Sequence, residues 1–250
     1  MREKEDKFMQ MSVQVNNLVK RFGSFPAVDD ISFSVAKGEI FGFIGPNGAG
    51  KSTTIRMLCG ILDQTSGVGT VEGFSIKTEP EKIKSVIGYM SQKFSLYDDL
   101  TVEENINFYG GIHGLSRDET KTRRSWILEM AGLRGKESNM TGALSGGWRQ
   151  RLSLGCAIIH GPKVVFLDEP TAGVDPISRR EFWLLIRGLA KAGTTIFVTT
   201  HYMDEVEFCD RIAMIYRGKI VAMGTSAELK TANKVDNLEM LFVNLIRGME

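Results

Sequence analysis

Residues 45–52 read Gly45-Pro46-Asn47-Gly48-Ala49-Gly50-Lys51-Ser52. They follow the apolar run Ile40–Ile44, which is typical of a strand buried on both faces, and they open a helical stretch from about Lys51 to Cys59. The pattern G-x-x-x-x-G-K-[ST] between a strand and a helix predicts a phosphate-binding loop, because glycines let backbone N–H groups turn toward an anion at a helix N-terminus. A chance glycine turn is the alternative, and the strand before the motif and the helix after it argue against it.

Two residues of this loop have predicted roles in nucleotide binding. Lys51 is expected to reach the β- and γ-phosphates, and the Ser52 hydroxyl is expected to ligate Mg²⁺. Thr53 follows directly in the helix. We therefore count the whole run from Gly45 to Thr53 as nucleotide-binding.

A pair of carboxylates follows a second apolar run. Asp168 and Glu169 come directly after Val164–Leu167, and ligand sites of open α/β sheets lie at the carboxyl ends of such strands. Asp168 is expected to hold Mg²⁺, directly or through water, and Glu169 to act as the general base on the attacking water. Pro170 stops the strand and holds the acids in a rigid turn. An acidic helix cap is the alternative, and it explains one carboxylate better than two.

The composition is that of an ordinary globular protein of one large domain, or of a domain with an embedded subdomain. The chain has 250 residues, 42% hydrophobic and 24% charged, and 31 basic against 30 acidic side chains give a formal charge of +1. Such a balance creates no field that recruits nucleic acid or anionic lipid. No apolar run approaches the ~20 residues that span a bilayer. Three scattered cysteines, Cys59, Cys156 and Cys209, are expected to be reduced thiols.

The hydrophobic pattern predicts an α/β fold. Alternation through Val13–Val35 indicates strands, Arg117–Met130 and Trp148–Ile159 indicate helices, and Arg211–Ala222 indicates a hairpin. A helix over about 177–192, ended by Gly193, lies between the buried strands 164–167 and 195–198, which favours a mostly parallel sheet covered by helices. A helical insertion is expected between the first and second buried strands. Residues 225–228 form a capping-box start for a last helical region.

Further landmarks point to one family. Leu144-Ser145-Gly146-Gly147, at the start of a helix, resembles the signature of ABC ATPases. Gln92, which follows the strand-like Val86–Met90, is similar to the Q-loop glutamine. Ala172-Gly173-Val174-Asp175 resembles the D-loop, and His201 resembles the switch histidine. Phe22 matches the aromatic residue that stacks on adenine, with Phe25 as a competitor. Each landmark alone has a simpler structural explanation, and their common order and spacing favour the functional one.

The resemblance covers about residues 13–224 and implies the organisation of the chain. It implies a P-loop NTPase core with a mostly parallel sheet, an N-terminal antiparallel β-subdomain and an inserted helical subdomain at about 93–160. We expect a flexible tail at 1–10, which lacks the apolar core of a secretory signal, the ABC ATPase domain at 11–224, and a C-terminal helical extension at 225–250. The apolar face at 238, 241, 242, 245 and 246 is expected to pack on its own domain, with a dimer contact as the alternative.

Family members pair head to tail around ATP and Mg²⁺, which assigns roles to the other residues. Ser145, Gly146 and Gly147 would grip the γ-phosphate of ATP bound to the partner. Gln92 and His201 would sense the γ-phosphate or the attacking water, with Gln92 also counted as a metal ligand, and Asp175 would link the two sites. The catalytic residues expected on this basis are Glu169, His201, Gln92 and Lys51.

The resemblance implies an ATP-hydrolysing subunit of an ABC transporter. Its partners would be a second copy or a similar subunit, and integral membrane permease subunits that contact the region of Gln92 and residues 94–104, without nucleic acid. Its location would be cytoplasmic, peripheral on the cytoplasmic face of the membrane. Residues 145–151 and 96–100 resemble the drug and polysaccharide exporter branch, although Trp148 stands where glutamine is usual. An importer subunit and a soluble ABC ATPase acting on ribosomes or DNA are the alternatives.

Overall fold

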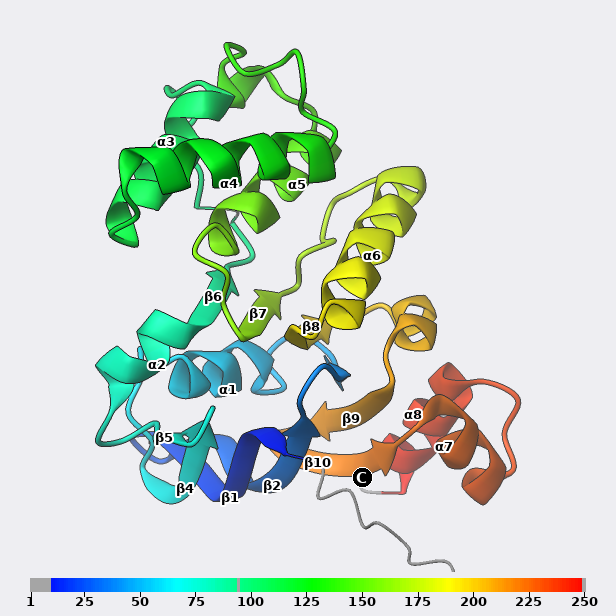
Figure 1. The fold of residues 1–250 in the computed structure, drawn as a ribbon. Coiled ribbons are helices and arrows are strands. Elements are labelled where there is room, and N and C mark those ends of the chain that lie inside the picture. Colours follow the sequence, from blue (N-terminus) through cyan, green and yellow to red (C-terminus); the bar gives the residue numbers. More distant parts are fainter. Residues whose placement is uncertain (1–9, 94, 249–250) are drawn as a thin grey trace, which may run out of the picture.

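The computed structural model describes residues 10–93 and 95–248. A six-stranded sheet with the order β10-β9-β3-β8-β7-β6 forms its centre (Figure 1). All neighbouring strands in it are parallel except β9 and β10, which form the predicted hairpin. The strands are β3 (Ile40–Ile44), β6 (Ile87–Met90), β7 (Val164–Asp168), β8 (Thr195–Thr200), β9 (Arg211–Tyr216) and β10 (Lys219–Gly224). The predicted α/β class with a mostly parallel sheet is confirmed.

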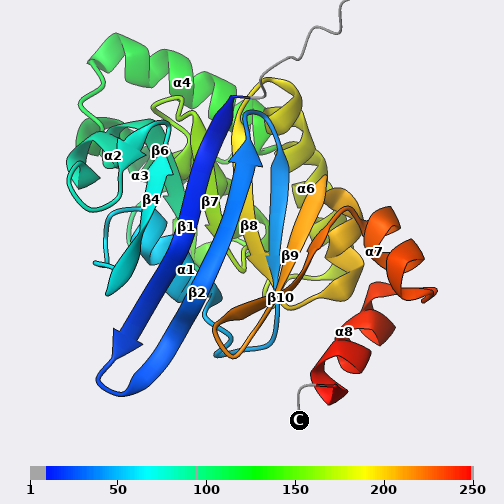
Figure 2. The ribbon, with the colours of Figure 1, turned by 90° about the horizontal axis from the view of Figure 1, so that it is seen from below.

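A second, antiparallel sheet comes mainly from the N-terminal part of the chain, as predicted. Its order is β2-β1-β4-β5, and the long strands β1 and β2 run side by side in Figure 2. The strands are β1 (Met11–Phe22), β2 (Phe25–Ala36), β4 (Ser66–Val71) and β5 (Phe74–Ser75). Val13 and Val15 of β1 are buried while Gln14 and Asn16 between and beside them are not, so one face of this sheet joins the core.

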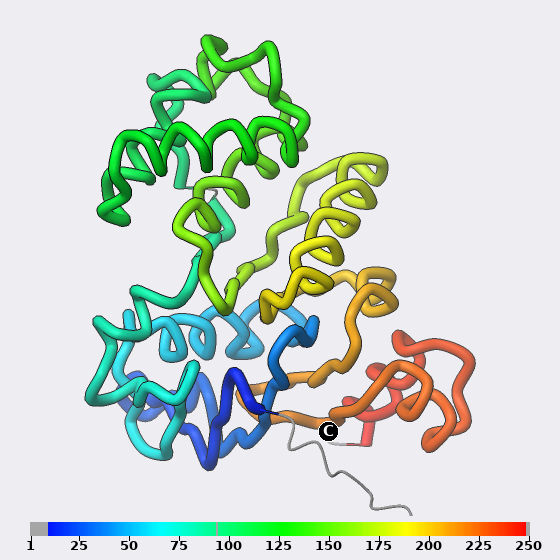
Figure 3. The backbone as a smooth tube through the Cα atoms, viewed as in Figure 1, coloured from blue at the N-terminus to red at the C-terminus, as the bar shows by residue number. Residues whose placement is uncertain are grey.

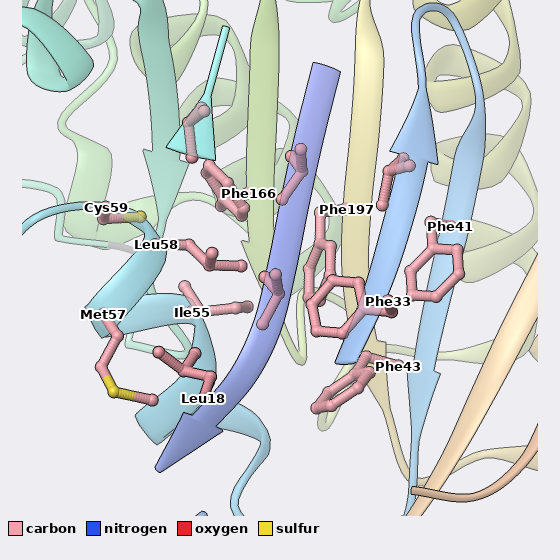
Figure 4. Packing of buried hydrophobic residues seen from close by; sticks show 14 of the residues in the cluster. Leu18, Phe33, Phe41, Phe43, Ile55, Met57, Leu58, Cys59, Phe166 and Phe197 are labelled. Carbon is pink, nitrogen blue, oxygen red and sulfur yellow. The ribbon is translucent and has the colours of Figure 1, made fainter. Parts of the chain in front are cut away.

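Alternate residues of the central strands face two different hydrophobic layers. Phe41, Phe166 and Phe197 point toward the antiparallel sheet, where they pack with Phe33 of β2 and with Phe43 (Figure 4). The centroid of the Phe197 ring lies 5.5–5.8 Å from the centroids of the other four phenylalanine rings. The intervening residues of the same strands pack on the opposite side against α6 (Pro176–Lys191). A sheet buried on both faces explains the continuous apolar runs in the sequence.

Helix α1 (Lys51–Leu58) lies between the two sheets, and its buried apolar residues Ile55, Met57 and Leu58 belong to the same core. Helices α3 (Val102–Ile112), α4 (Arg117–Met130) and α5 (Gly146–Ala157) form a separate hydrophobic cluster at the end of the molecule away from the antiparallel sheet (Figure 3). Trp148 packs against this cluster, with the Lys136 ammonium 3.7 Å from its ring centroid. No helix of residues 10–93 and 95–248 could cross a membrane.

The position of the helical insertion differs from the prediction. One more strand of the central sheet, β6, precedes it, so the insertion lies between the second and third buried strands rather than the first and second. After β5, the chain forms α2 (Pro80–Val86) and then β6 at the sheet edge. Val86–Met90 has a strand-like pattern, but β6 has only four residues and includes Gly88 and Tyr89, so periodicity alone does not show that it joins the buried central sheet.

The C-terminal residues form α7 (Ser226–Asn233) and α8 (Leu238–Arg247). The predicted capping box is present, since Thr225 accepts from the Glu228 N–H and Glu228 accepts in return. Leu238 and Leu241 are buried against β3, β9 and the 3₁₀ segment η2 (Met203–Phe208), so the apolar face packs on its own domain.

All three cysteines are free thiols, as expected. The expected flexible tail falls on residues 1–9, outside the described residues, and on Gln10.

Candidate active site

A cavity of about 440 Å³ opens at the carboxyl edge of the central sheet. The phosphate-binding loop between β3 and α1 forms one wall, and aromatic residues from the β1–β2 hairpin form another. Its lining residues are Phe22, Phe25, Ala27, Asn47, Gly48, Gly50, Lys51, Ser52, Thr53, Gln92 and Glu169. Residues separated by up to 147 positions in the sequence therefore meet in one place.

Two glycines of the loop are required by close backbone packing. A Cβ on Gly45 would lie 2.2 Å from the Ile215 carbonyl oxygen, and one on Gly50 would lie 2.4 Å from that of Ala27. Gly50 also has φ +108°, a conformation that residues with a Cβ rarely adopt. These contacts fix the loop against β9 and β2, so the N-terminus of α1 points into the cavity.

The Lys51 side chain is buried, and its ammonium group contacts three oxygen atoms. Its Nζ donates to the carbonyl oxygens of Gly45 at 2.7 Å and Pro46 at 3.0 Å, and it forms an ion pair with Glu169 Oε1 at 3.0 Å. An ammonium held by three oxygens beside the loop can exchange one of them for a phosphate oxygen at little geometric cost. The arrangement suits a phosphate-binding cation.

Ser52 and Asp168 form a compact oxygen site. The Ser52 hydroxyl donates to Asp168 Oδ1 at 2.9 Å, and the Thr199 hydroxyl donates to the same oxygen at 2.8 Å. A hydroxyl and a carboxylate are the hard donors that Mg²⁺ takes in nucleotide sites, where phosphates and water complete its shell. Among the described residues no group of three or more His, Cys, Asp or Glu could hold a metal ion.

Glu169 is the residue on which the other polar groups converge. Its Oε2 accepts from the Gln92 amide at 3.3 Å and lies 3.1 Å from His201 Nδ1. Its φ of +47° lies in the left-handed region, which is unusual for a residue with a side chain. This conformation turns Glu169 away from Asp168, so that the two adjacent carboxylates serve different groups. The structure thus brings Lys51, Gln92, Glu169 and His201 together.

Gln92 was also expected to bind the metal. In the structure its amide contacts Glu169, and the Asp168 carboxylate is held by Ser52 and Thr199 instead. Phe22 and Phe25 both line the cavity, at 51% and 61% exposure, and they face each other across the hairpin. Both rings are therefore available to stack on a base.

The expected signature residues lie outside this cavity. Ser145 and Gly146 are exposed at the N-terminus of α5, and the Ser145 hydroxyl makes no capping hydrogen bond. Gly147 is buried against α6, where a Cβ would lie 2.4 Å from Ser178 Oγ. Free N–H groups at an exposed helix N-terminus can bind an anion presented by another molecule.

Asp175 occupies the N-terminus of α6. Its carboxylate accepts from the backbone N–H groups of Ile177 and Ser178, and the bond from Ser178 is the main reason that its pKa is lowered. The residue is exposed and does not line the cavity. Its position at the surface is compatible with a contact to a second subunit.

Two residues that hold the site together were not predicted from the sequence. Thr199 binds Asp168 through its hydroxyl and also accepts from the Glu169 N–H at 3.0 Å. Gln150 is fully buried in α5, and its amide donates to the Pro170 carbonyl oxygen at 2.6 Å, which ties α5 to the turn after Glu169. The only sequence signal for Thr199 was a polar residue at the carboxyl end of a buried strand, and Gln150 had none.

Comparisons with known proteins agree with this architecture. The ABC transporter family model matches residues 28–172. The chain is 47% identical over 243 residues to a protein named probable multidrug ABC transporter ATP-binding protein YbhF of Escherichia coli strain K12, covering 95% of this chain and 42% of that protein. It is 42% identical over 233 residues to the linearmycin resistance ATP-binding protein LnrL of Bacillus subtilis strain 168, covering 93% of this chain and 75% of that protein.

A solved structure described as an ATP-binding subunit of an ABC transporter superimposes with a TM-score of 0.83 at 27% identity, covering 94% of this chain and 99% of the other. The fold and cavity define a P-loop nucleotide-binding protein. The chain belongs to the ABC transporter family, among its ATP-binding proteins. It spans less than half the length of the E. coli relative.

Proposed function

We propose that this chain binds and hydrolyses ATP as the nucleotide-binding subunit of an ABC exporter. The observation that carries the proposal is the convergence of Lys51, Gln92 and His201 on Glu169, at the wall of the cavity that the phosphate-binding loop also lines. The relatives add support for direction, since their names refer to multidrug transport and linearmycin resistance.

Each group has a proposed role in hydrolysis. Lys51 and the loop N–H groups bind the β- and γ-phosphates, while Ser52 and Asp168 hold Mg²⁺. The ion supplies positive charge that offsets charge on the transferring phosphoryl group. Glu169 accepts the proton of the attacking water, because its carboxylate is at the cavity wall and its partners can exchange for water.

Gln92 and His201 orient this reaction from two sides of Glu169. Both contact Oε2 of the carboxylate, at 3.3 and 3.1 Å. They limit its rotation and lie where the attacking water would approach. Their proposed role is to position the water and the γ-phosphate, with Glu169 as the base.

The exposed residues Ser145 and Gly146 imply a second subunit. They lie off the cavity of their own chain, and their position at a helix N-terminus suits the γ-phosphate of ATP bound to a partner. A head-to-tail homodimer, with Asp175 at the contact, would complete two sites. Membrane permease subunits would hold the pair on the cytoplasmic face of the membrane.

The hydrolysis proposal is tested with Glu169→Gln. The variant should bind ATP with little change and lose at least about a hundredfold in kcat, because a general base typically contributes that much. It should also accumulate an ATP-dependent dimer in size-exclusion chromatography. Glu81→Gln, at an exposed carboxylate on α2, serves as the matched control and should behave as the native protein. An undiminished kcat in Glu169→Gln would remove Glu169 as the base.

The transport proposal needs a separate experiment. Glu169→Gln protein locked with ATP is captured from native membranes, and the proteins that accompany it are identified. A stoichiometric polytopic membrane protein supports a transporter, and its sequence then distinguishes export from import. Capture of ribosomes or DNA without a membrane protein would contradict it and favour a soluble ABC ATPase.

A further inference from the structure

A stack of side chains connects the start of α6 to His201. Arg179 lies one helical turn after Asp175, and its backbone N–H donates to the Asp175 carbonyl oxygen at 2.9 Å. The Arg179 guanidinium lies 4.1 Å from the centroid of the Tyr202 ring. The Tyr202 and His201 ring centroids are themselves 4.1 Å apart, with an interplanar angle of 38°. The stack thus runs from the helix that Asp175 caps to the histidine beside Glu169.

A buried carboxylate holds the other side of the Arg179 guanidinium. The Glu205 side chain is 1% exposed, and neither of its oxygens has a hydrogen-bond partner. Arg179 Nε, 3.7 Å from Glu205 Oε1, is its only ion-pair partner within the described part of the chain. On the exposed side, Arg179 Nη1 donates a hydrogen bond to Asp204 Oδ2 at 3.5 Å. A buried carboxylate without its cation is costly, so Arg179 is fixed in place.

From this geometry we infer that Arg179 is a positioning residue for His201, a role that rests on the proposed function. The His201 ring is held by Glu169 on one side and by Tyr202 on the other. Tyr202 in turn is held by the guanidinium of Arg179, which lies over its ring. Removal of Arg179 therefore frees Tyr202 and changes the orientation of His201.

Steady-state ATP hydrolysis tests the positioning role. Arg179→Ala should lower kcat about tenfold while KM for ATP stays within about twofold, since misplacement of a catalytic group affects turnover more than binding. Arg179→Lys keeps a positive charge beside Glu205 and the Tyr202 ring, so it should recover part of the lost kcat. Arg179→Met keeps only the aliphatic stem and should not. Arg180→Ala, at an exposed arginine on the same helix, is the matched control and should retain the native kcat.

A double-mutant comparison separates this role from a structural one. In a His201→Ala background, Arg179→Ala should cause no further loss of kcat, because its effect passes through the histidine. A second, independent tenfold loss would overturn the inference. An Arg179→Ala protein with the native kcat would overturn it as well.

Histidine NMR tests the contact without relying on turnover. The chain has three histidines, and His113 and His160 stack on each other elsewhere, so they act as internal references. With ring-labelled histidine, Arg179→Ala should shift the His201 signals, identified by their loss in His201→Gln, and leave the other two in place. Unchanged His201 signals would refute the inference. Shifted signals in a protein without ATPase activity would refute the proposed function alone.

Discussion

Substitution of Thr199 by valine should weaken the metal site while the fold is retained. Valine has nearly the same shape, and Thr199 is fully buried, so the change leaves no large cavity. It removes a hydrogen bond to the Asp168 carboxylate and one of the two acceptors of the Glu169 N–H, the other being the Thr199 carbonyl oxygen at 3.2 Å. A hydrogen bond to a charged group contributes about 1.5–3 kcal/mol.

The expected effects follow from that value. The free energy of unfolding measured in urea should fall by about 2 kcal/mol. If the same free energy is lost in the transition state of hydrolysis, kcat falls roughly thirtyfold. The Mg²⁺ concentration for half-maximal activity should rise, since Asp168 keeps only the Ser52 contact. ATP hydrolysis is measured as a function of Mg²⁺, and urea unfolding by circular dichroism.

Thr195→Val is the matched control. Thr195 lies at the opposite end of β8, is 1% exposed, and accepts a hydrogen bond from the Gly38 N–H at 3.0 Å. It should lose about 1 kcal/mol of stability with the native kcat and Mg²⁺ dependence. If Thr199→Val also keeps the native kcat and Mg²⁺ dependence, Thr199 does not organise the acids and the reasoning is wrong.

Three further predictions concern the fold. Phe197→Ala should reduce the free energy of unfolding by about 3–5 kcal/mol, because it empties a fully buried site among four other rings; a loss below about 1 kcal/mol in urea denaturation would show that the core refills the space. Leu241→Ala should lower the free energy that holds α8 on the domain by about 2–5 kcal/mol. Proteolysis of the C-terminal helices should become faster while ATP binding persists. Equal cleavage rates in the variant and the native protein would contradict the anchoring role of Leu241. Burial, together with the adjacent His113, lowers the pKa of His160 to about 4 from 6.5. The unfolded chain therefore binds more protons between pH 6.5 and 4, and stability should fall by about 1–2 kcal/mol as the pH drops through this window, after allowance for solvent screening; thermal melts of His160→Phe should lack this part of the pH dependence.

Local pattern was sufficient for the elements that depend on neighbours in the chain. The run Val164–Leu167 identified a buried strand, the 3.6-residue period identified Arg117–Met130 as a helix, and Thr225 with Glu228 identified a helix start. The phosphate-binding loop was likewise readable, since its glycines, lysine and serine act within eight residues. The helix start and the loop depend on contacts between residues close in sequence, and the buried strand is recognised from its continuous run of apolar residue types.

The assembly of the site depended on contacts between distant residues. The pairing of Thr199 with Asp168, the bond from Gln150 to Pro170, and the Arg179–Tyr202 stack join side chains 20 to 31 positions apart. The sequence indicated a strand at Val86–Met90, and the structure decided its place at the edge of the central sheet by pairing β6 with β7. The sequence by itself determined which residues could bind phosphate, metal and water. Only the tertiary structure decided which side chains hold them in place, because those contacts arise from how helices and strands pack, and local residue patterns do not encode that packing.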